Sequence, residues 1–173
     1  MSILHSLLKI SDKICPAKVA YAHCDIPCGI YDPHLAQLSA HTVIRMINLI
    51  NELKSPGQDA TDAQMQEYHT KYSRYIEVKE HHAELCKHEI RILWGDYFKP
   101  EHAQKFPELH ELVWKAMKQA SKTKQEVNLQ ASEDLLKTVE QIAEIFWKTK
   151  GIEPVRTKSF YPTEREMVYP KVK

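Results

Sequence analysis

Apolar side chains recur at intervals of three and four residues in four stretches of the chain, which is the spacing of one face of an α-helix. The first stretch begins after Asp32-Pro33, because an aspartate cap followed by proline in the first turn is a favourable helix start. It ends before Ser55-Pro56-Gly57, a combination that interrupts a helix. The second stretch runs from about Thr61 to Trp94, directly before Gly95. These signals predict two helices joined by a short link.

Two further helices are predicted in the second half of the chain. Pro107 opens the third, and Ser132 is the expected cap of the fourth. Since no segment alternates apolar and polar residues over a sustained run, a sheet is not expected. Short links between amphipathic helices favour an all-α fold, namely an antiparallel four-helix bundle. In the second helix the predicted inner positions are Met65, Tyr68, Tyr72, Tyr75, Ile76, Leu85, Cys86, Ile90 and Leu93.

Composition narrows the possible classes of function. The chain has 173 residues, which is compatible with one domain, and a formal net charge of +1, which does not indicate a nucleic-acid partner. No apolar run approaches the roughly 20 residues of a membrane span, so no membrane partner is expected. Two of the four cysteines lie in one short motif, so a disulfide framework is not expected. Cys86 is interpreted as a small buried residue.

The motif His23-Cys24-Asp25-Ile26-Pro27-Cys28-Gly29 carries the candidate chemistry, since it places one imidazole and two thiols within six residues. Thiolate and imidazole bind the softer transition metals. A tetrahedral zinc site usually draws on two such hooks, and no second cysteine pair is available. Backbone nitrogen could complete the ligand set, which favours nickel or copper. A reducible thiol pair at Cys24 and Cys28 is the alternative.

At this motif, read through Tyr31, the sequence resembles the nickel-containing superoxide dismutases, whose nickel hook is His-Cys-Asp-x-Pro-Cys-Gly-x-Tyr. Leu93 to Pro100, followed by Pro107 to His110, resembles the middle segment of that family. Ile145 to Lys150 resembles its usual C-terminal end. The resemblance therefore covers residues 23–150 in one register, as three anchors in the expected order.

The resemblance implies a precursor that is cut immediately before His23, so that residues 1–22 form a propeptide. It implies one nickel ion per subunit, held by the new α-amine, the amide nitrogen of Cys24 and the thiolates of Cys24 and Cys28. The imidazole of His23 would be an axial ligand in the oxidised state. The implied reaction is the disproportionation of superoxide to dioxygen and hydrogen peroxide, with the metal cycling between Ni(II) and Ni(III).

Other implied features concern access to the metal and assembly. Asp25, Pro27 and Tyr31 would form a narrow mouth, in which Tyr31 or Tyr97 orders a water, and Lys99 would attract the superoxide anion. Family members assemble as homohexamers. Residues 1–22 contain charges that interrupt any apolar signal region, which favours a cytoplasmic precursor cut by a dedicated maturation protease. Export remains the alternative, because Ala20-Tyr21-Ala22 fits a signal-peptidase site.

The sequence departs from the family pattern in two places. Where the best-known branch has a glutamate and an arginine that support the axial imidazole, this chain has Ser39 and His82, so His41, His82 or another subunit would have to substitute. Residues 151–173 extend beyond the family pattern and are expected to be an extended tail, disordered or laid on a neighbouring subunit. Two other functions remain open: a nickel or copper carrier without turnover, and a thiol-exchange or interaction module.

Overall fold

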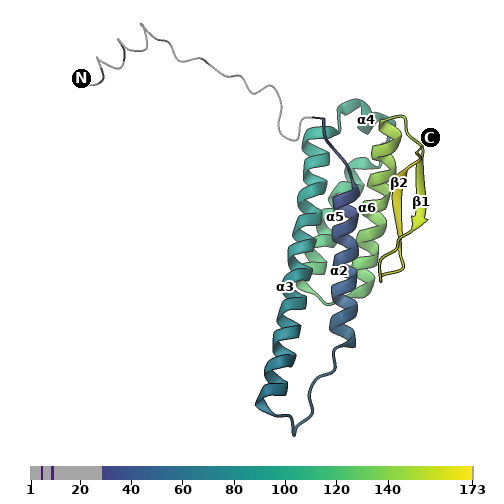
Figure 1. Cartoon of the computed structure of the whole chain (residues 1–173). Coiled ribbons are helices and arrows are strands. Elements are labelled where there is room, and N and C mark those ends of the chain that lie inside the picture. The colour runs from purple at the N-terminus through teal and green to yellow at the C-terminus, as the bar shows by residue number, and fades with distance from the viewer. Residues whose placement is uncertain (1–4, 6–8, 10–28, 173) are drawn as a thin grey trace.

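A computed structural model describes residues 29–172 together with His5 and Lys9. Four long helices lie alongside one another, and a two-stranded sheet covers one side of them (Figure 1). The long helices are α2 (His34–Glu52), α3 (Asp62–Ile92), α5 (Leu109–Gln125) and α6 (Leu129–Thr149). Two short elements join α3 to α5: the π-helical turn η1 (Leu93–Tyr97) and helix α4 (Pro100–Lys105). None of the described helices is long and apolar enough to cross a membrane.

The first two helices begin and end close to where the sequence predicts. The carboxylate of Asp32 accepts a hydrogen bond of 2.6 Å from the N–H of His34, the first residue of α2. Helix α3 begins with a reciprocal capping box, in which Thr61 and Gln64 each satisfy the backbone N–H of the other. Both starts are therefore set by side chains that accept from otherwise unpaired amide groups at a helix N-terminus.

The inner face predicted for α3 is correct only in its second half. All the fully buried residues of α3 lie from Lys79 onward, whereas Tyr72 is 37% exposed. The reason is visible in Figure 1, where the start of α3 and the end of α2 project beyond α5 and α6. This part of α3 thus has no layer of α5 or α6 to cover it.

The expected cap of the fourth helix is wrong by one turn. Helix α6 begins after Asn128, whose side-chain oxygen accepts a hydrogen bond of 3.0 Å from the N–H of Ala131. Ser132 lies inside the helix, is buried, and donates its hydroxyl to the carbonyl of Leu129. Asparagine and serine are about equally good caps, so the earlier of two candidates four residues apart begins the helix.

The four long helices enclose a core of aliphatic side chains from α2, α3, α5 and α6. Cys86 belongs to this core and is 1% exposed, which confirms the expectation of a small buried residue. Burial raises the pKa of its thiol to about 12, so the side chain stays protonated and unreactive. Lys79 is equally buried, and its ammonium group donates to the carbonyls of Thr123, Lys124 and Glu126 at the end of α5.

The sequence did not predict the sheet. Strands β1 (Pro154–Lys158) and β2 (Glu166–Pro170) pair antiparallel, with Val155 opposite Tyr169 and Arg156 opposite Val168. We call residues 151–172 the C-terminal hairpin; it packs against α2 and α6 of its own chain (Figure 1). Its inner strand buries two consecutive residues, Met167 and Val168, so the alternation that normally marks a strand is missing.

Candidate metal centre

Only the C-terminal end of the predicted metal-binding motif lies within the residues that the structure describes. His23, Cys24, Asp25, Pro27 and Cys28 lie outside the described residues, which resume at Gly29. Gly29 has a φ of +86°, in the left-handed region that favours glycine. A side chain at this position would have free space around it but a strained backbone. The glycine that follows the second cysteine of the motif therefore allows the chain to turn at this position.

The structure brings Tyr31 and Tyr97 together, although 66 positions separate them in the sequence. Their ring centroids are 5.4 Å apart with an angle of 51° between the planes, a tilted arrangement that aromatic pairs favour. Tyr31 is the last residue of the motif and Tyr97 is the last residue of η1. The motif therefore enters the described fold at the end of the bundle where α3 and α6 finish.

The side chain of Tyr97 is held in place by residues at the end of α6. Its hydroxyl lies 2.7 Å from the hydroxyl of Thr149, which in turn donates to the carbonyl of Phe146. The ring of Phe146 packs at 4.6 Å from that of Tyr97, and the ammonium group of Lys150 stands 5.4 Å from the Tyr97 ring centroid. This cation lies over the aromatic face, where the ring quadrupole attracts it.

Sequence reasoning did not assign Thr149 or Lys150 to the site. Both follow Phe146 within one turn of α6, so they face the same direction along the helix end. A threonine and a lysine at the end of a helix do not by themselves indicate a functional site. The signal that could have found them was their position in the third family anchor, which ends at Lys150.

The backbone of Lys99 lies close to Tyr97. It precedes α4, and its N–H donates to the Nδ1 atom of His102, whose ring stacks at 5.7 Å from Tyr97. The side chain of Lys99 is exposed. The structure therefore places the ammonium group of Lys150 over the Tyr97 ring, and it places Lys99 two residues after Tyr97 with an exposed side chain.

The residues at the departures from the family pattern make contacts within their own helices. Ser39 is buried and donates its hydroxyl to the carbonyl of Leu35. The Nδ1 atom of His82 lies 2.8 Å from the carbonyl of Val78. His41, which with His82 was a candidate for support of an axial imidazole, is bound by the C-terminal hairpin instead, through Thr163 and the carbonyl of Glu166.

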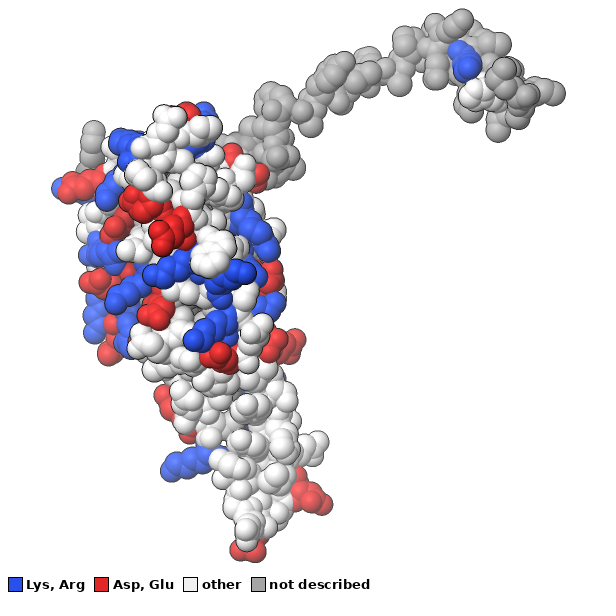
Figure 2. Space-filling view, turned by 180° about the vertical axis from the view of Figure 1, so that it is seen from behind, with Lys and Arg blue, Asp and Glu red and all other residues white. Residues whose placement is uncertain are grey.

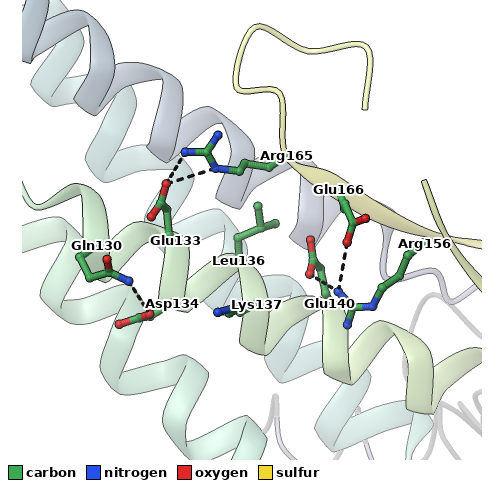
Figure 3. Close-up of a pocket in the computed structure, with 9 residues that line it drawn as sticks. All are labelled: Gln130, Glu133, Asp134, Leu136, Lys137, Glu140, Arg156, Arg165 and Glu166. Carbon is green, nitrogen blue, oxygen red and sulfur yellow. Dashed lines mark hydrogen bonds and ion pairs between the residues drawn. The ribbon is translucent and has the colours of Figure 1, made fainter. Parts of the chain in front are cut away.

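Outside the motif, the described part of the chain offers no obvious second centre. Within it, no group of three or more His, Cys, Asp or Glu side chains is arranged to hold a metal ion. A pocket of about 410 Å³ lies between α6 and the hairpin (Figure 3). Arg165 pairs there with Glu133, and Arg156 pairs with Glu140. Each arginine of the hairpin points toward its glutamate on α6, and we interpret the pocket as a charged seam between the two elements (Figure 3).

The surface carries charge of both signs. On the face shown in Figure 2, basic and acidic side chains are interspersed over the broad part of the molecule. The narrow end, where α2 and α3 project, has few charges on this face. A long-range attraction of one sign is therefore not evident on this side, and any attraction of a small anion rests on local cations.

Comparison with known proteins gives a consistent result. Residues 18–150 match the family described as nickel-containing superoxide dismutase. The chain is 39% identical over 141 residues to Superoxide dismutase [Ni] of Streptomyces coelicolor, covering 82% of this chain and 98% of the relative. It is 38% identical to the protein of the same name from Streptomyces seoulensis, with the same coverage.

Solved structures agree with these relatives. A native nickel superoxide dismutase structure at 1.30 Å superposes with a TM-score of 0.63 and 36% identity, covering 75% of this chain and 99% of that chain. A nickel-containing superoxide dismutase whose nickel ligation corresponds to the oxidised state superposes with a TM-score of 0.61 at the same identity and coverage. The family match ends at Lys150, before strand β1 begins.

Proposed function

This chain belongs to the nickel-containing superoxide dismutase family, and we propose that its metal is held by an N-terminal hook of His23, Cys24 and Cys28. It is an oxidoreductase that acts on superoxide and uses nickel as its cofactor. The observation that carries the proposal is the uninterrupted motif from His23 to Tyr31, which lies inside the range matched by the family.

The donor set of the hook fits nickel. Two thiolates and an imidazole are ligands for the softer transition metals, and the thiolate is the binding form of cysteine. Cleavage before His23 releases an α-amine with an ordinary pKa of about 7.7–8.0, which adds a nitrogen donor. With the amide nitrogen of Cys24, the amine and the thiolates of Cys24 and Cys28 make four donors, and the His23 imidazole is a further ligand. Nickel held there, cycling between Ni(II) and Ni(III), supplies one-electron chemistry that converts two superoxide ions and two protons to dioxygen and hydrogen peroxide.

The described residues of the chain act around this centre. Tyr31 and Tyr97 form one wall of the mouth, with Asp25 and Pro27 of the hook completing it. The hydroxyl of Tyr97 donates to Thr149, whose own proton goes to the carbonyl of Phe146, so the Tyr97 oxygen can accept from a water and hold it in a constant position. Lys99, together with Lys150 over the Tyr97 ring, gives the mouth a local positive charge that favours entry of an anion.

Several finer features belong to the same proposal. Residues 1–22 act as a propeptide, which a maturation protease removes before the chain becomes active. The described long helices form an antiparallel four-helix bundle with the hook at its N-terminal end. The mature enzyme works in the cytoplasm as a homohexamer, each subunit with one nickel ion. Family membership and the charged character of residues 1–22 support these assignments.

The test uses a chain that begins at His23, loaded with nickel and compared with the chain that begins at Met1. We expect about one nickel per chain and rapid superoxide turnover only when His23 carries the free amine. Cys24→Ser and Cys28→Ser should each lose nickel and turnover, whereas Cys86→Ala should keep both, because Cys86 is buried in the core of the helical bundle. Nickel bound without turnover would indicate a carrier. Turnover that survives both hook substitutions would overturn the proposal.

A further inference from the structure

The C-terminal hairpin lies beyond the family match, yet it is packed against the segment that leads out of the proposed hook. We propose that this hairpin is a positioning element for residues 29–37, with Val168 and Tyr169 as its positioning residues. The inference rests on the proposed function, since it concerns the segment that would carry the nickel hook.

The first contact is an apolar one at the tyrosine pair. Val168 is 2% exposed and belongs to a buried cluster with Leu93, Ala143, Phe146 and Trp147. Tyr31 and Tyr97 both pack against that cluster. A side chain of the hairpin therefore helps to form the apolar support beneath the two rings. Because buried side chains fill their space closely, a loss of volume at this position is transmitted to its neighbours.

The second set of contacts lies along one stripe of α2. The ring of Tyr169 is 6.1 Å from that of His34, the first residue of the helix. One turn later, the side chain of Gln37 accepts a 2.7 Å hydrogen bond from the N–H of Val168 and donates one of 3.0 Å to its carbonyl. The backbone of β2 is thus paired with a glutamine side chain as it would be with a further strand.

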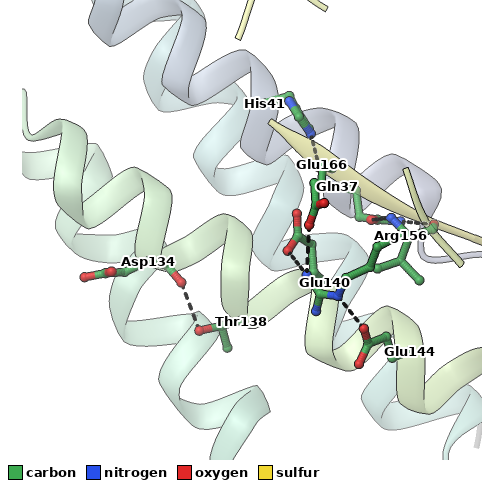
Figure 4. A network of polar contacts seen from close by, with 9 residues as sticks. Gln37, His41, Asp134, Thr138, Glu140, Glu144, Arg156 and Glu166 are labelled. Atoms are coloured by element: carbon green, nitrogen blue, oxygen red, sulfur yellow. Dashed lines mark hydrogen bonds and ion pairs between the residues drawn. The ribbon is translucent and has the colours of Figure 1, made fainter. Parts of the chain in front are cut away.

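A third contact follows at the next turn of the same stripe. The two ring nitrogens of His41 lie 2.7 Å from the hydroxyl of Thr163 and 3.0 Å from the carbonyl of Glu166. Residues 34, 37 and 41 share one face of the helix, because they are separated by three and four positions. The hairpin accordingly holds the beginning of α2 over two turns (Figure 4).

The hairpin is itself fixed to α6, so it can act as a rigid support. Arg156 on β1 donates to Glu140 at 2.6 Å and to Glu144 at 2.5 Å, two residues one turn apart on α6. Figure 4 shows Glu140 and Glu144 around Arg156, and it shows Gln37 and His41 beside the strand that they bind. The hairpin also follows directly after α6 in the chain. It therefore connects the end of α6 with residues 31–37.

The test measures amide hydrogen exchange in the metal-free full-length chain. Val168→Ala and Tyr169→Ala are compared with Lys158→Ala, which removes an exposed ion pair with Glu164 on the same hairpin. We expect exchange in the peptide covering residues 29–40 to become about tenfold faster or more in the first two variants, while α5 keeps its rate. Lys158→Ala should match the original chain. Tyr169 is partly exposed, so its variant provides the reading if Val168→Ala does not fold.

Two outcomes would overturn the inference. In one, the hairpin peptide exchanges faster while residues 29–40 keep their original rate, which would make the hairpin a separate surface element. In the other, residues 29–40 and α5 change by the same factor, which would make its role one of general stability. Nickel release from the corresponding chains that begin at His23 is then measured, and we expect faster release for Val168→Ala and Tyr169→Ala. If the unsubstituted chain binds no nickel, the proposed function fails while the exchange result still stands.

Discussion

The helical core and the C-terminal hairpin are held by different kinds of contact. Between the four long helices most buried side chains are apolar, and Lys79 is a charged exception. The buried hydroxyls of these helices bond within their own helix, namely those of Ser39, Thr123, Ser132 and Thr138. Between the hairpin and the helices, Gln37, His41 and Glu140 are all buried and all hydrogen-bonded. Apolar packing is non-directional and tolerates small shifts, whereas a buried polar contact loses its value when the geometry changes. The interface between the hairpin and the helices therefore fixes the position of the hairpin along α2 and α6 more strictly than apolar packing fixes the helices against one another.

The largest expected effect tests the exception within the core. Lys79→Met keeps the length of the side chain but leaves the carbonyls of Thr123, Lys124 and Glu126 without their common donor. Burial lowers the pKa of the Lys79 ammonium, yet three acceptors keep it bound in place at the end of α5. We expect a loss of about 2–4 kcal/mol in the free energy of unfolding, measured by urea denaturation.

Lys87→Met is the matched control on the same helix. Lys87 also reaches from α3 to α5, but it is only half-buried and donates to one hydroxyl, that of Ser121. We expect this control to change the free energy of unfolding by less than about 1 kcal/mol. Equal losses for both variants would show that the hydrogen bonds from Lys79 to the end of α5 stabilise the fold no more than the single bond from Lys87 does. Lys79 would then not be an energetic exception to the apolar packing of the core.

A smaller effect is expected from Gln37→Leu, which removes the bidentate partner of β2. The N–H and carbonyl of Val168 would be left unpaired in a buried position, at a cost of about 1–3 kcal/mol. The loss should appear as fast amide exchange in the hairpin while the core helices keep most of their protection. Gln37→Glu serves as a control, since its carboxylate can accept from the N–H but cannot donate to the carbonyl. An intermediate result for glutamate would support the pairing, and a result equal to the original chain would contradict it.

The same contrast explains how far the sequence could predict the structure. The helices follow from apolar spacing and from caps such as Asp32 and Thr61, because these signals act within one or two turns. The cap at Asn128 and the exposure of Tyr72 were missed, since each depends on which of several neighbours is packed against the helix. The helical class was predictable for this reason, and exact helix ends were less so.

The hairpin and the surroundings of the tyrosines were not predictable in the same way. Val168 pairs with Gln37 across 131 positions, and Tyr97 pairs with Thr149 across 52, so no local pattern encodes either contact. The hook was recognisable because its ligand types are rare and closely spaced. The residues at the departures from the family, Ser39 and His82, make hydrogen bonds within their own helices.

The smallest effect concerns the protonation of His41 in the hairpin interface. The carbonyl of Glu166 can only accept, so the Nε2 atom carries the proton of the neutral ring and Nδ1 accepts from the hydroxyl of Thr163. Around the ring lie Tyr161, edge-on at 5.3 Å, and the cations Arg45 and Arg165. Burial and, to a lesser extent, Arg165 lower the pKa of His41 below its ordinary 6.5, although the hydrogen bond to Glu166 partly opposes them.

Because the folded state holds His41 neutral and the unfolded state protonates it more readily, this residue stabilises the fold fully above pH 6.5. Its contribution is lost as the pH falls below 6.5 toward the lowered pKa of the folded state. The free energy of unfolding should therefore decrease between pH 7 and pH 5, with a slope of at most about 1.4 kcal/mol per pH unit from this one group. His41→Gln can still donate to the Glu166 carbonyl but does not titrate, so its unfolding curve should depend less on pH over that range. If both proteins lose stability in parallel, the titration of His41 does not act on the hairpin, and the acid sensitivity of this interface must come from the carboxylates that bind Arg156.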